Sequence, residues 1–138
     1  RKTIKMKKYF SLFLSLFPLY LIAQENIFHN RNFWNENISV EIVKQKTAEG
    51  NNPTSFNNNG FDATTFALLA GANPEVVKYL LSFEDNSIEK RTHDSRIYLH
   101  WATMGGNAEN VELLLKLGSN PAARDSRGNT PFVFSAGS

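Results

Sequence analysis

The stretch VELLLKLGSNPAARDSRGNTP, residues 111–131, decides the fold. Its apolar residues recur at helical spacing from Val111 and Leu114 onward, and Gly118 stands where a helix of this length is expected to end. A polar turn follows. Pro131 then suits the first turn of a helix, because the N–H that proline lacks would have no partner there. The stretch therefore predicts the end of one helix, a turn and the start of the next.

The same pattern recurs along the chain with a period of 34 residues. Glu41, Glu75 and Glu109 lie on this grid, and each is followed by a valine two positions later. A polar residue precedes each glutamate by two positions: Ser39, Asn73 and Asn107. Such residues cap helix N-termini, and the glutamates meet the positive end of the helix. These segments are therefore predicted to be the second helices of a repeating unit.

The first helices of the units carry a different signature. YLHWA (98–102) and TPFVFSA (130–136) occupy equivalent places, and a glycine turn precedes the second. They resemble the T-P-L-H-x-A signature of ankyrin repeats. The resemblance extends well over residues 57–138 and weakly over 26–56, and the second unit has DATT (62–65) in the place of the signature. It implies an all-α fold, an ankyrin-type helix-turn-helix solenoid of about three repeats and a truncated fourth.

Residues 1–24 differ in kind from the repeats. A short basic start, Met6-Lys7-Lys8, precedes an uncharged apolar run over 9–22. At ~1.5 Å per residue this run spans about 21 Å as a helix, which is short of the ~30 Å hydrocarbon core of a bilayer. A secretory signal peptide is therefore expected, with an uncleaved anchor as the alternative.

The expected boundaries follow from these features. They are 1–5 for an upstream extension, 6–24 for the signal peptide, 25–56 for a degenerate N-terminal capping repeat, 57–91 and 92–124 for two ankyrin repeats, and 125–138 for a truncated repeat. Because a solenoid needs a polar terminal cap, we expect the natural protein to continue past Ser138.

Charge and composition restrict the classes of function. The chain has 15 basic and 13 acidic residues, a formal net charge of +2, and no cysteine. Five basic residues and no acidic ones fall in 1–24, so the remainder carries ten basic against thirteen acidic residues. A mildly acidic domain without a Lys/Arg run lacks the footprint of a nucleic-acid binder, and no nucleic-acid partner is expected. The absence of cysteine excludes disulfides, thiolate catalysis and cysteine-ligated zinc.

The residues of the chain predict neither catalysis nor metal binding. The three histidines, His29, His93 and His100, pair with no other residue at zinc-ligand spacing. His93, Asp94 and Ser95 have the residue types of a catalytic triad, but adjacent residues on a turn cannot form the relay. We expect no enzyme, no metal and no cofactor. His100 matches the signature histidine, and the resemblance implies that it is structural and hydrogen-bonds the neighbouring loop.

The resemblance also implies a partner-binding strip, formed by the hairpin tips and the exposed edge of the first helices. Its positions are counted from the turn residues Gly60, Ser95 and Gly128. The strip consists of Asn58, Asn59, Phe61, Leu69, His93, Asp94, Arg96, Met104, Ser126, Arg127 and Asn129. Amide, charged, aromatic and Met side chains together suit an adaptable protein-binding surface. The alternative is a solvated loop edge without a ligand.

A row of aromatic residues runs beside this strip. Phe66, Trp101 and Phe134 each lie six positions after the turn residue, and Phe33 or Trp34 is near the corresponding place in the first unit. The row could stack on sugars or clamp an apolar peptide. The other interpretation, which we favour, is that the rings pack between neighbouring first helices.

These features predict a non-catalytic protein–protein interaction module. We expect an exported bacterial protein, periplasmic or secreted, that is monomeric and has no membrane insertion after signal cleavage. Two alternatives stay open: the repeats position the substrate of a larger enzyme, or they belong to an envelope assembly.

Overall fold

The computed structural model describes residues 25–137, and this part of the chain contains helices and turns but no strand. The signal peptide expected at 6–24 and the extension at 1–5 lie outside the described residues. The elements in order are η1 (Ile27–His29), η2 (Arg31–Phe33), α1 (Val40–Ala48), α2 (Ala63–Leu69), α3 (Pro74–Leu81), η3 (His93–Ser95), α4 (Tyr98–Gly105), α5 (Ala108–Lys116) and α6 (Pro131–Ala136). The all-α prediction is confirmed.

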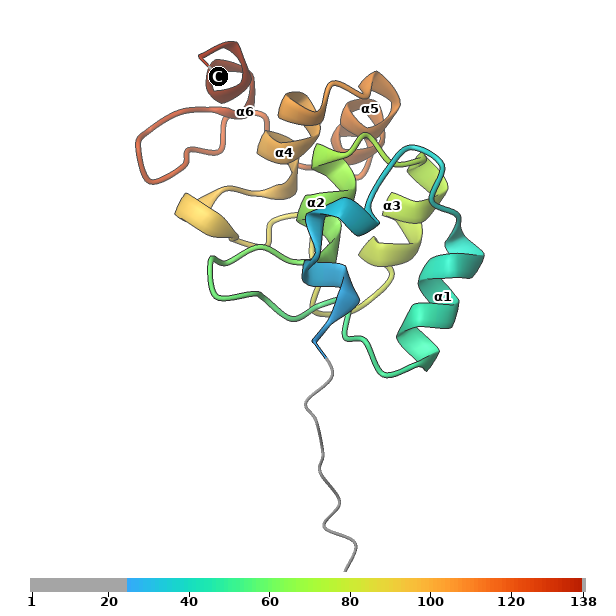
Figure 1. Ribbon diagram of the computed structural model, residues 1–138. Coiled ribbons are helices and arrows are strands. Elements are labelled where there is room, and N and C mark those ends of the chain that lie inside the picture. Colours follow the sequence, from blue (N-terminus) through green and yellow to red (C-terminus); the bar gives the residue numbers. More distant parts are fainter. Residues whose placement is uncertain (1–24, 138) are drawn as a thin grey trace, which may run out of the picture.

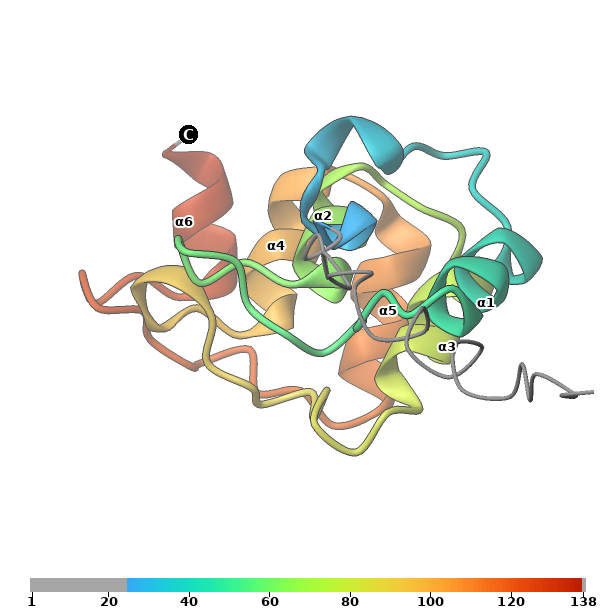
Figure 2. The ribbon, with the colours of Figure 1, turned by 60° about the horizontal axis from the view of Figure 1, so that its bottom comes forward.

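The helices form two rows (Figures 1 and 2). The inner helices α2, α4 and α6 pack one against the next, and so do the outer helices α1, α3 and α5. Each of the pairs α2–α3 and α4–α5 is an antiparallel helix-turn-helix unit. The arrangement is the predicted solenoid. Within residues 25–137, no helix is long and apolar enough to cross a membrane.

The helix ends follow the caps predicted from the 34-residue grid. Ser39 Oγ accepts a hydrogen bond from the backbone N–H three residues later at 3.4 Å. Asn73 and Asn107 accept from the N–H two residues later at 2.9 and 3.0 Å. Pro131 begins α6, and Gly118 follows the last turn of α5 with φ of +94°. Local sequence thus sets the boundaries of the outer helices directly.

The first unit departs from the regular pattern. Two 3-10 turns, η1 and η2, replace an inner helix, and η1 packs against α2. The segment is held by its aromatic side chains: Phe28 is fully buried, and Trp34 Nε1 donates to the Phe28 carbonyl at 3.0 Å. The capping segment is therefore ordered by side-chain packing without a regular helix.

The inner helices α2 and α4 approach each other closely at Gly105. A Cβ at this position would fall well inside van der Waals contact with the carbonyl oxygen of Leu68. Glycine is required here because only a residue without a Cβ allows the close backbone approach. Backbone conformation is not the reason, since the φ of Gly105 is not in the left-handed region. Leu68, Leu99 and Leu114, all fully buried, fill the core around this crossing.

A buried polar network ties the second unit to the third. Asp62, fully buried, caps α2 by accepting from Thr65 N–H and Oγ1, both at 2.9 Å. Its second oxygen accepts from the Tyr98 hydroxyl at 2.7 Å and contacts Lys90 Nζ at 2.8 Å. Lys90 also donates to Asn86 Oδ1 at 2.9 Å. Every oxygen of the buried carboxylate therefore has partners, as a charge in the interior requires.

Candidate functional site

The turns before α2, α4 and α6 have equivalent backbone geometry. Gly60, Ser95 and Gly128 all have positive φ, of 77°, 58° and 82°. The equivalence of Ser95 to the turn glycines, predicted from register alone, therefore agrees with the backbone. Asp94 is left-handed as well, with φ of 55°. Two consecutive non-glycine residues in this region are unusual, since each carries a steric cost.

Successive turns are joined by single backbone hydrogen bonds. His93 N–H donates to the Gly60 carbonyl and Ser126 N–H donates to the Asp94 carbonyl, both at 2.9 Å. His93 Nδ1 also lies 2.8 Å from the carbonyl oxygen of Asn59. The three tips therefore form one connected edge, and the residues of the partner-binding strip at these tips come together in space.

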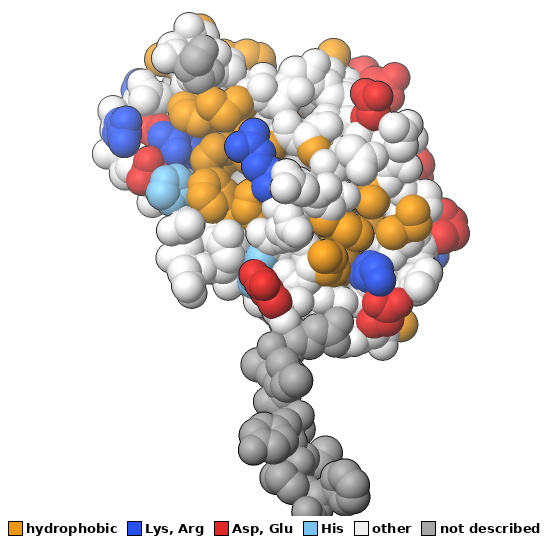
Figure 3. Space-filling model, in the orientation of Figure 1, with side chains coloured by type: hydrophobic (Ala, Val, Ile, Leu, Met, Phe, Trp, Pro, Cys, Tyr) orange, Lys and Arg blue, Asp and Glu red, His pale blue; other side chains and the backbone are white. Residues whose placement is uncertain are grey.

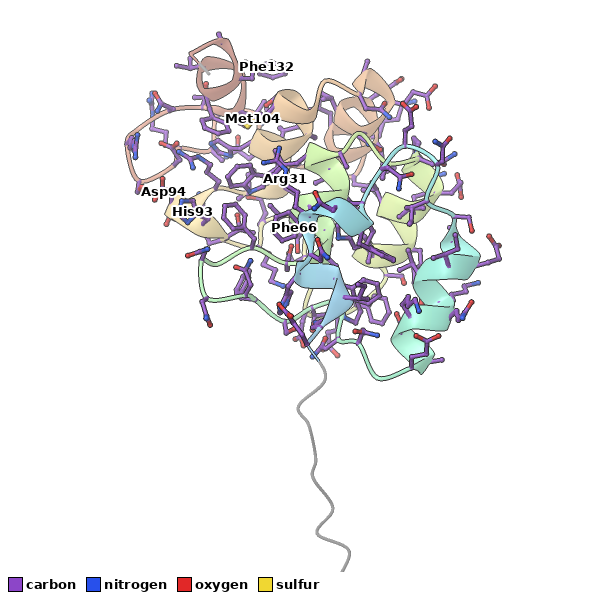
Figure 4. The ribbon with its side chains drawn as sticks, in the orientation of Figure 1. Arg31, Phe66, His93, Asp94, Met104 and Phe132 are labelled. Carbon is purple, nitrogen blue, oxygen red and sulfur yellow. The ribbon has the colours of Figure 1, made fainter. Side chains whose placement is uncertain are left out.

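The exposed members of the strip are mostly polar. Asn58, Asn59, Ser126 and Arg127 are exposed, and Met104 is 37% exposed at the end of α4. The structure also leaves Leu69, His93, Asp94 and Asn129 partly exposed. Figure 4 shows His93 and Asp94 together at one tip, with Met104 and Phe132 nearer the C-terminal end. This surface is accessible to a partner.

Arg96 differs from the expectation that it lies on the exposed edge. Its side chain is only 7% exposed and forms ion pairs with Asp94 at 3.2 Å and Asp125 at 3.1 Å. The guanidinium stacks over the rings of Phe134 at 4.1 Å and Trp101 at 5.2 Å. Asp94 and Trp101 belong to the same unit as Arg96, whereas Asp125 and Phe134 come from the next, so Arg96 holds two units together and is not accessible.

The surroundings of Asp125 keep its carboxylate ionised and so stabilise its ion pair with Arg96. Its carboxylate accepts from the backbone N–H groups of Arg127 and Asn129 at 2.9 and 2.8 Å, in addition to the contact with Arg96. Burial raises the pKa of Asp125, but these hydrogen bonds and the nearby guanidinium outweigh it, and the pKa is lowered overall. The carboxylate therefore stays ionised and shapes the last hairpin.

Phe66 and Trp101 of the aromatic row are packed in the interior, which is the interpretation we favoured, and Phe134 is half-buried beside them. Phe66 and Trp101 are 8% and 4% exposed, and Trp101 Nε1 donates to Thr92 Oγ1 at 2.7 Å. Phe61, a member of the strip, bridges the two rings at 5.5 and 5.4 Å between centroids. Trp101 in turn meets Phe134 edge-on at 5.6 Å. Stacking on a ligand would need open ring faces, which these buried rings lack. The row therefore stabilises the packing of the inner helices, and Phe61 is largely part of this packing.

His100 has the structural role that the resemblance implied. It is fully buried, and its Nε2 lies 3.0 Å from the carbonyl oxygen of Asn129 on the next hairpin. Nδ1 has no hydrogen-bond partner among the described residues. A neutral imidazole that donates from Nε2 fits this environment, because protonation would place an unpaired N–H in the interior.

This burial predicts a loss of stability in acid. Desolvation lowers the pKa of His100 in the folded protein, with the nearby Arg96 acting in the same direction and Asp125 opposing it. Below about pH 6.5 the unfolded chain takes up a proton at this histidine more readily than the folded chain does. The free energy of unfolding should therefore fall as the pH drops below 6.5. Urea unfolding between pH 7.5 and pH 5 should show a shallower fall in His100→Gln than in the wild type; parallel curves would contradict the prediction.

A pocket between residues 31–37 and α2 was not predicted from the sequence. Its volume is about 520 Å³, and it lies where the loop after η2 faces α2. Its lining consists of Arg31, Asn32, Trp34, Asn35, Glu36, Asn37, Phe66, Leu69 and Ala70. Leu69 alone belongs to the predicted strip. Residues 31–37 carry no repeat signature, so the available signals were the amide side chains of this segment and the place of Phe33 or Trp34 in the aromatic row with Phe66. In Figure 4, Arg31 and Phe66 lie next to each other at this place.

Figure 3 shows the molecule as a surface in the orientation in which Figure 4 labels Arg31 and His93. Hydrophobic side chains gather on this face beside a histidine and basic side chains. Among residues 25–137, no group of three or more His, Cys, Asp and Glu side chains is arranged to hold a metal ion.

Comparison with known proteins shows the family to which these repeats belong. A family model described as ankyrin repeats (3 copies) matches residues 33–136. An ankyrin repeat protein of Acanthamoeba polyphaga mimivirus is 38% identical over 60 residues, which is 44% of this chain and 8% of that protein. The palmitoyltransferase ZDHHC13 of Mus musculus is 39% identical over 59 residues, 42% of this chain and 9% of that protein. The matches thus cover less than a tenth of the length of these relatives. The chain belongs to the ankyrin repeat family, whose repeats are generally protein–protein interaction modules and whose domains are typically non-catalytic.

Proposed function

We propose that this chain is a non-catalytic module that binds another protein along the partner-binding strip. The observation that carries the proposal is the connected edge of hairpin tips. The backbone bonds from His93 to Gly60 and from Ser126 to Asp94 hold the tips in fixed positions before any partner arrives. A preorganised surface loses less conformational entropy on binding, so more of its contact energy appears as affinity.

The chemistry of the strip supports a protein partner of mixed polarity. The tips present the carboxamides of Asn58 and Asn59, and Arg127, whose side chain is 74% exposed. Asp94 is 28% exposed and shares its carboxylate between Arg96 and Arg127 at 3.2 and 3.8 Å. Exposed amide and charged groups of both signs recognise a polar protein surface more readily than a polyanion.

The pattern of residues 6–24 supports export, and we propose a periplasmic or secreted location for a bacterial, monomeric protein. A basic start and an apolar run too short to span a bilayer are typical of a cleaved signal. A second candidate function is the positioning of a substrate within a larger enzyme. One relative is named as a palmitoyltransferase, and its match to this chain covers 9% of its length.

Capture with a strip variant tests the proposal. The full chain is immobilised and exposed to periplasmic extract, in parallel with the double variant Met104→Glu and Arg127→Glu. We expect the variant to bind the captured protein at least tenfold more weakly, a loss of about 1.4 kcal/mol, because it places two new carboxylates on the strip. Lys116→Glu is the matched control, since Lys116 is 72% exposed on the outer helix α5.

Two results would contradict the proposal. One is equal retention of the captured protein by wild type and by the double variant. The other is a loss of binding in the Lys116→Glu control that matches the loss in the double variant. A melting curve of each variant shows that the fold is retained, because all three substituted side chains are exposed.

A further inference from the structure

The pocket beside α2 exists because the first unit lacks an inner helix. On one side α2 packs against α4, as α4 packs against α6. On its other side it meets η1, and the chain after η2 turns away through Asn35, Glu36 and Asn37. Space that an inner helix would fill is therefore left open over about 520 Å³. This volume falls within the usual range of ligand pockets.

The floor of the pocket is rigid and aromatic. Trp34 is 4% exposed and is fixed by its hydrogen bond to Phe28. Phe66 is 8% exposed and packs against Phe61 at 5.5 Å between ring centroids. Leu69, which is partly exposed, completes the apolar part of the wall. A ligand here meets an apolar floor that does not have to be ordered on binding.

The rim carries two charges of opposite sign that do not pair. Arg31 and Glu36 are both exposed, and within residues 25–137 neither side chain has an ion-pair or hydrogen-bond partner. The amides of Asn32 and Asn37 stand beside them, and Asn35 uses its Oδ1 to accept from Asn37 N–H at 2.9 Å. The rim thus offers a planar guanidinium for a carboxylate and carboxamides for peptide N–H and C=O groups.

We infer that this pocket binds a short extended segment of a partner protein in which an apolar residue stands beside an acidic one. The acidic side chain pairs with Arg31, and the apolar side chain lies against Leu69 and the small exposed parts of Trp34 and Phe66. Glu36 disfavours ligands with several negative charges, such as polyphosphates, and leaves a single carboxylate as the best match for Arg31. The inference rests on the proposed protein-binding function and adds the chemistry of one contact.

Two capped dipeptides test it directly. Acetyl-Leu-Glu-amide and acetyl-Leu-Gln-amide have nearly the same shape and differ in one charge. They are titrated into the full chain, and binding is followed by amide chemical shifts. We expect the Glu peptide to bind at least fivefold more tightly, with shift changes confined to residues 31–37 and 66–70. In Arg31→Gln the two peptides should bind equally, whereas the control Lys116→Gln should keep the wild-type preference.

The inference is overturned if the two peptides bind wild type equally, if neither binds at millimolar concentration, or if Arg31→Gln keeps the preference for Glu. Arg31 is exposed, so unchanged melting of Arg31→Gln verifies its fold. The result is separable from the proposed function. If the strip variant loses the captured protein but the pocket shows no preference for the Glu peptide, only this inference is wrong. If the pocket prefers the Glu peptide but the chain captures no protein, the proposed function is wrong.

Discussion

Asp62→Ala is expected to lower the free energy of unfolding by about 3–5 kcal/mol, the cost of removing one partner from a buried ion pair. The substitution leaves Lys90, whose side chain is 13% exposed, without the carboxylate that neutralises it at 2.8 Å. It also removes the cap of α2 and the nearer of the two acceptors of the Tyr98 hydroxyl, which leaves Asn86 Oδ1 at 3.2 Å. Domains of this size are stable by only about 5–15 kcal/mol, so much of the folded population is at risk.

Urea unfolding of Asp62→Ala and of Asp85→Ala measures this effect. Asp85 is exposed, so its substitution removes the same charge and should change stability by less than about 0.5 kcal/mol. Adding Lys90→Met to Asp62→Ala should recover part of the loss, because the unpaired ammonium is then absent. A single variant Asp62→Ala within about 1 kcal/mol of wild type would show that the network contributes little.

Gly105→Ala is expected to destabilise the protein by about 3 kcal/mol, at the upper end of the usual cost of overpacking. In an unconstrained helix this change would stabilise by about 1 kcal/mol, since alanine is the better helix former. Here the new methyl group would collide with the Leu68 carbonyl, which is backbone and cannot rotate away. The helices α2 and α4 must separate, and the core around Leu99 must loosen with them.

The neighbouring glycine supplies the control for this prediction. Gly106 has φ of +74° and open space around it, so Gly106→Ala should cost only the left-handed strain of about 1 kcal/mol. Thermal unfolding of both variants compares the two costs. If Gly105→Ala is no more destabilising than Gly106→Ala, the close approach of α2 and α4 is not rigid.

The parts of the fold that could be predicted are those governed by residues close in sequence. Ser39, Asn73 and Asn107 cap helices through N–H groups two or three residues away, so a single sequence contains the whole interaction. The turn at Ser95 could be predicted as well, because its place in the repeat matches those of Gly60 and Gly128, and all three residues have positive φ.

What could not be predicted depends on residues from different units. Arg96 is buried because Asp125 and Phe134 of the next unit close over it, and no local pattern announces this. The pairing of Asp62 with Tyr98 links residues 36 positions apart. The pocket arises because the first unit has the short 3-10 turns η1 and η2 in place of an inner α-helix, and no repeat pattern marks this difference. The positions of the helices could thus be predicted from the sequence, whereas the solvent exposure of individual side chains could not.

One backbone hydrogen bond joins each hairpin tip to the next and fixes the spacing of the tips along this edge. Each tip is positioned by the backbone of its neighbour, through Gly60 and Asp94, and the exposed side chains take no part in these bonds. A change of the exposed Asn58 side chain therefore alters the surface of one tip without moving the other tips. An insertion between two tips would instead shift the position of every later tip. On such an edge the exposed side chains can change one position at a time, because the backbone hydrogen bonds keep the spacing of the tips constant.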